Sequence, residues 1–204
     1  MASTRTLPHS AHAAARASWP ALPADKLRSQ TDEEERANAW SHGLALALAL
    51  AAWPWLMTAG HARDGTIGAL ACAVFCGSMA FQYLASCVYH ALPPGRAKLW
   101  ARAVDHAAIY LFIAGSATPF MLAALGGGVG LLSCALIWCI ALTGAWLKLT
   151  RRLTNRRWST GLYVLLGWFA FLAMSPALWQ IDATALASLL AGGGAYMLGT
   201  VFFL

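Results

Sequence analysis

The sequence predicts an all-α integral membrane protein with six membrane-spanning helices. Hydrophobic residues make up 59% of the 204 residues and charged residues only 11%, and the mean hydropathy is +0.58. This composition is typical of a chain surrounded by lipid. The apolar residues also gather into long runs, near the length of about 20 residues that a helix needs to cross the hydrocarbon.

The composition divides the chain into two parts. Residues 1–31 are rich in Ala, Ser and Pro, carry scattered Arg and His, and contain no apolar segment. We therefore expect a disordered cytoplasmic N-terminal tail there and not a secretory signal peptide. An organelle transit peptide is the alternative for this Arg-bearing start. Residues 32–204 are expected to form the transmembrane helical bundle.

The first helix is predicted to begin directly after Thr31. This residue is a good N-cap, and the acidic residues 32–35 place negative charge in the first helical turn. The first span is expected near residues 43–60, where tryptophans lie close to both ends, as in an aromatic belt.

Five further spans follow, separated by turn signals and charged segments. A polar loop at 61–65 and the Pro-Pro-Gly sequence at 93–95 bound the second span, and a glycine-rich turn at 126–130 precedes the fourth. Pro119 is expected to kink the third span. The five spans are expected near residues 66–92, 104–125, 130–147, 160–179 and 183–204.

The basic residues predict the orientation. Thirteen of the 14 Lys and Arg lie in or beside the tail and at the second-to-third and fourth-to-fifth connections, and only Arg63 lies on the opposite side. Because cytoplasmic loops carry the excess of Lys and Arg, we expect a multi-pass protein of the plasma or inner cell membrane with a cytoplasmic N-terminus. This clustering argues against nucleic acid as a partner, despite the net charge of +6.

Cysteines and glycines in the spans are interpreted as packing residues. All five cysteines lie inside apolar stretches, which favours small buried hydrophobic groups over redox chemistry. A soft-metal site at Cys72 and Cys76, which are four residues apart, is the minor alternative. Gly144 and the run Gly192, Gly193 and Gly194 are expected to permit close helix packing.

Polar residues gather at the end that is predicted to face the cytoplasm. Ser86 and His90 are four residues apart at the end of the second span and therefore share one helical face. Asp105 opens the third span, which re-enters the membrane from the same side. Another polar face, where the first helix enters the same leaflet, consists of Glu35, Asn38 and His42. Since ionisable groups in a membrane are costly and usually functional, we predict a polar pocket there.

Two interpretations of these residues stay open. A neutral imidazole is a good zinc ligand, and a nearby carboxylate can orient or deprotonate a metal-bound water, which would suit metal-assisted hydrolysis. In the other interpretation, Asp105 pairs with Arg102 or His106 at the interface, and His90 hydrogen-bonds a carbonyl at a helix end. Spacing alone favours the second interpretation.

Three segments, in this order, are highly specific as a set: EERANAWSHG at 34–43, SMAFQYLASCVYHAL at 78–92 and DHAAIYLFIAGSATPFML at 105–122. Together they resemble the hemolysin III family, the bacterial branch of the progestin and adipoQ receptor superfamily that includes the adiponectin receptors. The GGGAYMLGTVFF ending also resembles the sixth span of this family. The likeness therefore extends over residues 32–204.

The resemblance implies a seven-transmembrane-type bundle with a cytoplasmic N-terminus and a zinc ion near the cytoplasmic face. It implies His90 as a metal ligand and Asp105 and Ser86 as catalytic residues that orient and assist a metal-bound water. Eukaryotic relatives are linked to ceramide-type amide hydrolysis, and bacterial members are named for lysing red cells and are tied to membrane-lipid homeostasis.

One departure from the family pattern concerns the remaining zinc ligands. The family takes them from a His-x-x-x-His pair on the seventh helix, and this sequence contains no such pair after its sixth span. We therefore expect a truncated reading frame without the seventh helix, and impaired zinc binding.

The leading hypothesis is a hemolysin III-like zinc-dependent lipid amide hydrolase with a cytoplasm-facing site and with membrane lipids as its partners. The alternatives are a pore-forming or membrane-perturbing hemolysin without enzymatic activity, and a lipid-sensing receptor or scaffold. A homo-oligomer is compatible with either class.

Overall fold

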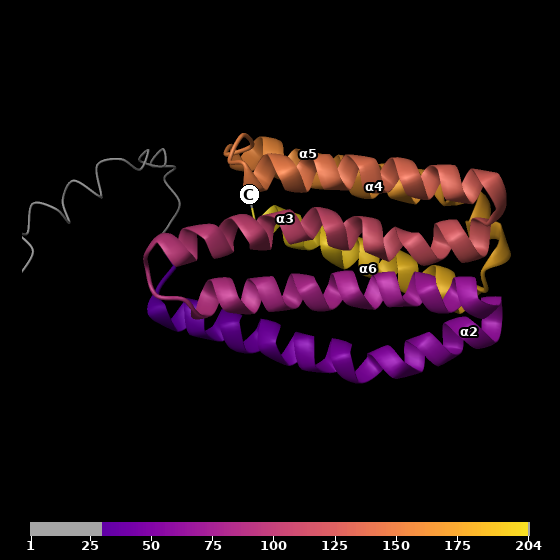
Figure 1. Cartoon of the computed structure of the whole chain (residues 1–204), viewed down its shortest axis with the longest axis horizontal. Coiled ribbons are helices and arrows are strands. Elements are labelled where there is room, and N and C mark those ends of the chain that lie inside the picture. Colours follow the sequence, from indigo (N-terminus) through magenta and orange to yellow (C-terminus); the bar gives the residue numbers. More distant parts are fainter. Residues whose placement is uncertain (1–29, 204) are drawn as a thin grey trace, which may run out of the picture. The chain divides into compact units, whose positions relative to one another are not determined.

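The computed structural model describes residues 30–203, and these residues form helices joined by short turns, with no strand among them. The predicted disordered tail, except for its last two residues, lies outside the described residues, as does Leu204. In chain order (Figure 1), the elements are α2 (Asp32–Ala91), α3 (Arg96–Pro119), the π-helix η1 (Phe120–Leu125), α4 (Gly127–Leu149), α5 (Arg156–Ala173), the 3₁₀-helix η2 (Ser175–Gln180) and α6 (Ala183–Phe203).

Helix α2 consists of two arms that fold back on each other (Figure 1). The backbone leaves the helical region only at Asp64 and Gly65, and Gly65 has φ +61°, a conformation that glycine adopts without steric cost. The sequence predicted a five-residue loop at 61–65. The turn is shorter because two residues reverse the chain, so residues 61–63 stay in the first arm.

The basic connection predicted before the third span is also helical. Helix α3 begins at Arg96 directly after Gly95, so that Lys98 and Arg102 lie in its first turns. A helix satisfies its own backbone hydrogen bonds and long basic side chains reach toward water from it, so the charged residues do not require a loop.

Two prolines mark departures from regular α-helix. The π-helix η1 follows Pro119, and such irregular turns are a known cause of helix kinks. Pro176 lies in η2, which takes up the end of the segment predicted as the fifth span, because proline has no N–H to continue the α-helix. The predicted turn at 126–130 is confined to Gly126 and Gly127, both with positive φ.

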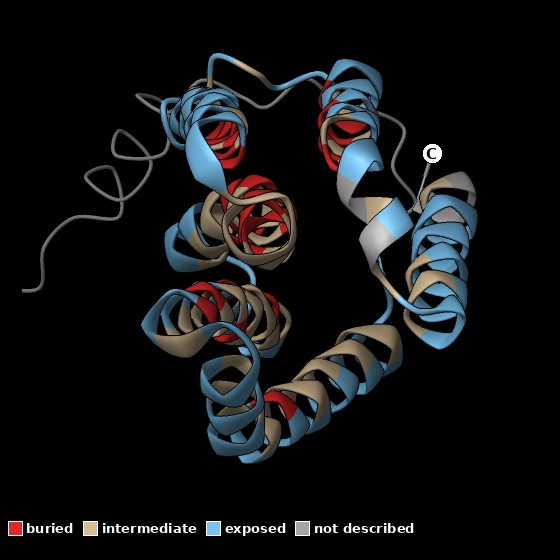
Figure 2. Cartoon of the chain, turned by 90° about the vertical axis from the view of Figure 1, so that its right-hand side faces the viewer, coloured by how far each residue is buried: buried red, intermediate tan, exposed pale blue. Residues whose placement is uncertain are grey.

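The core lies where α3 meets α4 and α5, around the fully buried Tyr110, Met121 and Ile137. Buried residues also line the contact between α2 and α3 (Figure 2). There, a Cβ atom on Gly115 would overlap the side chain of Ser78. Glycine therefore lets these two helices approach each other more closely than any other residue would.

Three of the described helices are long and apolar enough to cross a membrane: α2, the continuous stretch Arg96–Leu125, and α4. Their outward faces carry large apolar side chains, and Leu48 and Leu131 are 63% and 64% exposed. Soluble proteins rarely expose apolar surface on this scale. The fold is therefore that of a helical membrane protein.

Candidate functional site

Asp105 is a buried carboxylate between the second arm of α2 and α3. Its exposed fraction is 7%, and that of Ser86, across the helix contact, is 4%. Gln82 Nε2 donates a hydrogen bond to Asp105 Oδ1 at 3.2 Å, and the Ser86 hydroxyl acts electrostatically on the same carboxyl group. The structure therefore places the two predicted catalytic residues in the same buried region.

Glu35 joins both arms of α2 to α3 at the same end of the bundle. Its Oε2 lies 2.7 Å from His90 Nδ1, and its Oε1 lies 2.9 Å from Lys98 Nζ. Lys98 also donates to the carbonyl oxygen of Leu92 at 3.0 Å. Partial burial by itself would raise the pKa of Glu35, but the hydrogen bonds and charges of His90 and Lys98 outweigh it and hold this pKa below its usual range.

The contact with Glu35 sets the tautomer of His90. An ionised carboxylate only accepts hydrogen bonds, so Nδ1 of His90 donates to it, and Nε2 of a neutral ring keeps its lone pair. His42 stacks on His90 with ring centroids 5.8 Å apart and an interplanar angle of 4°. An imidazole oriented by a carboxylate in this way is prepared to act as a base or a metal ligand.

The interfacial pairing considered from the sequence is not what the structure shows. Among the described residues, Asp105 forms no ion pair with Arg102 or His106 and accepts a hydrogen bond from the neutral side chain of Gln82. His90 contacts a carboxylate and not a helix-end carbonyl. The backbone carbonyl of His106 instead accepts a hydrogen bond from Tyr163 at 2.9 Å, which ties α5 to α3.

The donor set of the described residues does not by itself make a zinc site. No three His, Cys, Asp or Glu side chains among residues 30–203 are grouped so that they could hold a metal ion. Protein zinc sites use three or four such ligands. His90 offers one oriented imidazole, and within this part of the chain further ligands do not converge on it.

Sequence reasoning missed two residues of this cluster, Gln82 and Lys98. Gln82 lies four residues before Ser86 on the same helical face and is the only amide side chain in the predicted second span. That isolation was a usable signal. Lys98 was used only in the count of basic residues that predicts the orientation in the membrane, because nothing in the sequence showed that Glu35 would lie beside it.

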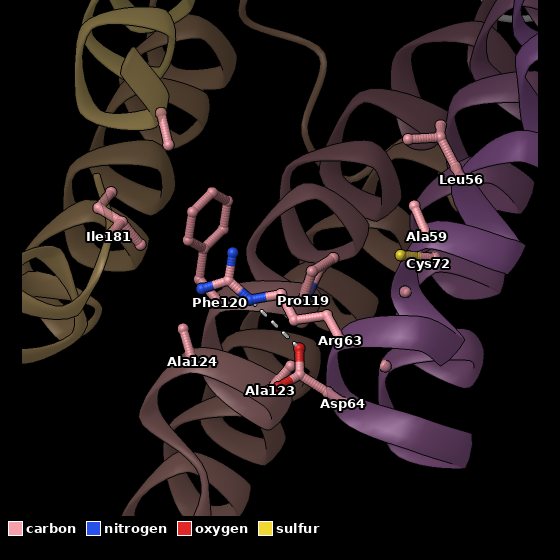
Figure 3. Close-up of a pocket in the computed structure, with 13 residues that line it drawn as sticks. Leu56, Ala59, Arg63, Asp64, Cys72, Pro119, Phe120, Ala123, Ala124 and Ile181 are labelled. Carbon is pink, nitrogen blue, oxygen red and sulfur yellow. Dashed lines mark ion pairs between the residues drawn. The ribbon is translucent and has the colours of Figure 1, made fainter. Parts of the chain in front are cut away.

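A separate hollow of about 260 Å³ lies between the turn of α2, the end of α3 and the start of α6 (Figure 3). Its lining is mostly apolar and includes Phe120 and Ile181. The only charged pair among its lining residues is Arg63 and Asp64, with Nε and Oδ2 3.7 Å apart. Ser86, His90 and Asp105 do not line it, whereas Cys72, one member of the cysteine pair considered from the sequence, does.

Membrane-length helices, an apolar outer surface and a buried polar cluster at one end define an all-helical integral membrane protein. The family described as "Haemolysin-III related" matches residues 30–204. The chain belongs to this family, which confirms the resemblance that its sequence segments indicate.

Two relatives match most of the chain. It is 36% identical over 180 residues to Hemolysin-3 of Bacillus cereus, covering 86% of this chain and 80% of that protein. It is 30% identical over 174 residues to the Hemolysin-3 homolog of Bacillus subtilis (strain 168), covering 85% of this chain and 82% of that protein. No solved structure matches the chain.

Proposed function

We propose that this protein is a membrane-embedded hydrolase that cleaves an amide bond of a membrane lipid at a cytoplasm-facing site, with zinc as its cofactor. The observation that carries the proposal is the buried Asp105 carboxylate, which accepts a hydrogen bond from Gln82 and lies with the buried Ser86 at the same end of the bundle as His90. Buried polar clusters between membrane helices are expensive to maintain and are usually functional.

The residues of the site suit hydrolysis of a polar bond at the membrane surface. Asp105 can accept a proton from water, and the hydrogen bond from Gln82 holds this carboxylate in place. General-base catalysis of this kind contributes about 10²- to 10⁴-fold in rate. The lipid class follows from the position of the site within a bundle whose outer surface is apolar, and the amide class from the resemblance to the family.

Zinc enters the proposal through His90. Its Nδ1 contacts Glu35. Histidines that bind a metal through one ring nitrogen commonly donate a hydrogen bond from the other to a carboxylate, which orients the ring. Because the described residues provide no group of three ligands, the metal part of the proposal requires ligands from outside them.

A metal assay tests this part directly. Zinc per protomer is measured in detergent for the wild type, for His90→Ala and for the control His61→Ala, which changes an exposed histidine near the turn of α2. We expect zinc to be lost only in His90→Ala. Equal zinc in all three proteins would contradict the ligand assignment.

A hydrolysis assay tests the catalytic part. With a ceramide-type lipid in reconstituted vesicles, Asp105→Asn keeps the side-chain size and removes the base, so we expect a rate loss of about 10²-fold or more. Undiminished hydrolysis in this variant would remove Asp105 from the proposal. The orientation is tested with a tag ahead of Met1, which we expect to be unreachable from outside intact cells.

The names of the two relatives, Hemolysin-3 and Hemolysin-3 homolog, favour membrane lysis as a second candidate function. Dye release from liposomes distinguishes the two candidates when it is measured for the wild type and for Asp105→Asn. Release that persists in the variant would show that lysis does not depend on catalysis. Loss of both dye release and hydrolysis would show that lysis depends on Asp105.

A further inference from the structure

Lys148 is a buried cation near the end of α4. Its exposed fraction is 8%, and no hydrogen bond or ion pair joins its side chain to a described residue. A buried charge is costly unless a partner of opposite charge compensates it. Lys148 therefore requires an anion that the described part of the chain does not supply.

Further cations from neighbouring helices increase this requirement. Arg102 of α3 and Arg156 of α5 are both half-buried. The charge of Arg102 acts on Lys148, and the charges of all three residues act together on His106. Three helices therefore direct positive charge to one end of the bundle.

The carboxylates of Glu35 and Asp105, at the same end of the bundle, are already engaged elsewhere. Glu35 is bound by His90 and Lys98, and Asp105 accepts a hydrogen bond from Gln82. Neither forms an ion pair with Lys148. The compensating anion is therefore expected to come from outside the described chain.

The same three helices also form an apolar groove of about 300 Å³, a volume at the lower end of the range of small-molecule sites. Tyr110 of α3 and Leu162 of α5 line it together with one stripe of α4. A Cβ atom on Gly144 would collide with the Tyr110 ring. The groove extends to Gly144, which lies one helical turn before Lys148, and to Leu147, which lies directly before it.

We infer that α3, α4 and α5 form a binding site for an anionic phospholipid, with its phosphate against Lys148, Arg102 and Arg156 and one acyl chain in the groove. A ligand with an anionic head and an apolar chain matches both features, because each of the three helices contributes a cation and a groove-lining residue. Basic pockets between membrane helices recognise anionic head groups, and Lys and Arg are the usual phosphate-binding side chains. This site goes beyond the proposed function and shares no residue with the Ser86 and Asp105 pair.

Lipid selectivity tests the inference with the full chain in vesicles. Spin-labelled phosphatidylglycerol and phosphatidylcholine are compared by the fraction of label whose motion the protein restricts. We expect the wild type to prefer phosphatidylglycerol by at least about fivefold, the effect of roughly one well-placed basic residue. Lys148→Gln should abolish the preference, and Lys148→Arg should keep it.

The matched control is Arg157→Gln, which removes the same charge from an exposed position in the same basic segment. We expect its preference to stay within about twofold of the wild type. An equal loss in Lys148→Gln and Arg157→Gln would overturn the inference, since it would show attraction to the general surface charge and not to a built site.

The groove has its own pair of variants. Leu162→Trp fills the groove while all cations remain, and Leu165→Trp adds the same bulk on α5 at a position that is 65% exposed and outside the groove. We expect loss of restricted phosphatidylglycerol only in Leu162→Trp. Because this pair leaves Lys148 in place, it tests the inference even if Lys148→Gln does not fold.

Inorganic phosphate distinguishes a lipid head group from a free ion. We expect millimolar phosphate to leave the restricted lipid fraction unchanged. Complete displacement by phosphate, together with wild-type behaviour of Leu162→Trp, would overturn the lipid assignment in favour of a free-phosphate site.

Discussion

Glycines occur both in the contact between α2 and α3 and along α6, but the two regions use them differently. A Cβ on Gly115 of α3 would overlap Ser78 of α2, whereas nothing lies within 4 Å of the Cβ positions of Gly192, Gly193 and Gly194. The expectation of close packing therefore holds for Gly144 and is wrong for the α6 run within the described residues, while Gly115 is a close approach that the sequence analysis did not single out.

The polar contacts differ in the same way. Side-chain hydrogen bonds cross from α2 to α3, as between Gln82 and Asp105, whereas the hydroxyl of Ser188 in α6 bonds only to a carbonyl of its own helix. None of the described side chains of α6 is buried (Figure 2). Apolar composition places a helix in lipid. Two helices are held together by small residues at their contact and by polar side chains that hydrogen-bond from one helix to the other.

The largest expected change in the free energy of unfolding comes from replacing a closely packed glycine with a large residue. Gly115→Leu should destabilise the protein by about 3 kcal/mol, because the added side chain meets Ser78 in a packed contact. Gly193→Leu should change the free energy of unfolding by no more than about 0.5 kcal/mol. Unfolding in mixed micelles, followed by circular dichroism, measures both. Equal losses would show that α6 is packed as tightly as α3.

Removing the charge of Glu35 should have the next largest effect. Glu35→Gln weakens the hydrogen bonds to both His90 and Lys98, so we expect a loss of about 2 kcal/mol in the free energy of unfolding. Glu33→Gln, at an exposed position two residues earlier, is the control and should be close to neutral. A neutral Glu35→Gln variant would mean that this contact does not help to hold α2 on α3.

A smaller loss is expected when Gln82 is replaced. Gln82→Leu keeps the apolar bulk but removes the donor to Asp105, which should cost about 1 kcal/mol. Ser188→Ala in α6, which removes only a bond within one helix, should cost less in the same unfolding assay. The reverse order would contradict the importance given to cross-helix bonds.

The smallest global effect is expected at the start of α6. Asp182 Oδ1 accepts a hydrogen bond from the backbone N–H of Ala185 at 2.8 Å, so Asp182→Ala removes a helix cap worth about 1 kcal/mol locally. Faster amide exchange should appear in the first turn of α6, with little change in α3. Equal acceleration in both helices would show that α6 unfolds together with the rest.

Part of the site could be predicted from spacing. Ser86 and His90 share a face because residues four apart always do in a helix, and Asp105 lies near Ser86 because a short connection returns the chain to the same end. Gln82 carried a weaker signal, as the only amide side chain in an apolar run. Lys148 gave none, because a lysine at the end of a span normally reaches water.

The pattern of apolar and basic residues by itself determined the all-helical membrane class, since the free energy of transfer into lipid depends on composition and length, and the family followed from short ordered segments. Only the tertiary structure decided that Glu35 meets His90 and Lys98, that Lys148 is buried, and that the glycines of α3 and α6 differ. These facts depend on how helices rotate and approach one another. That choice is made by contacts between residues distant in the chain, which no local pattern encodes.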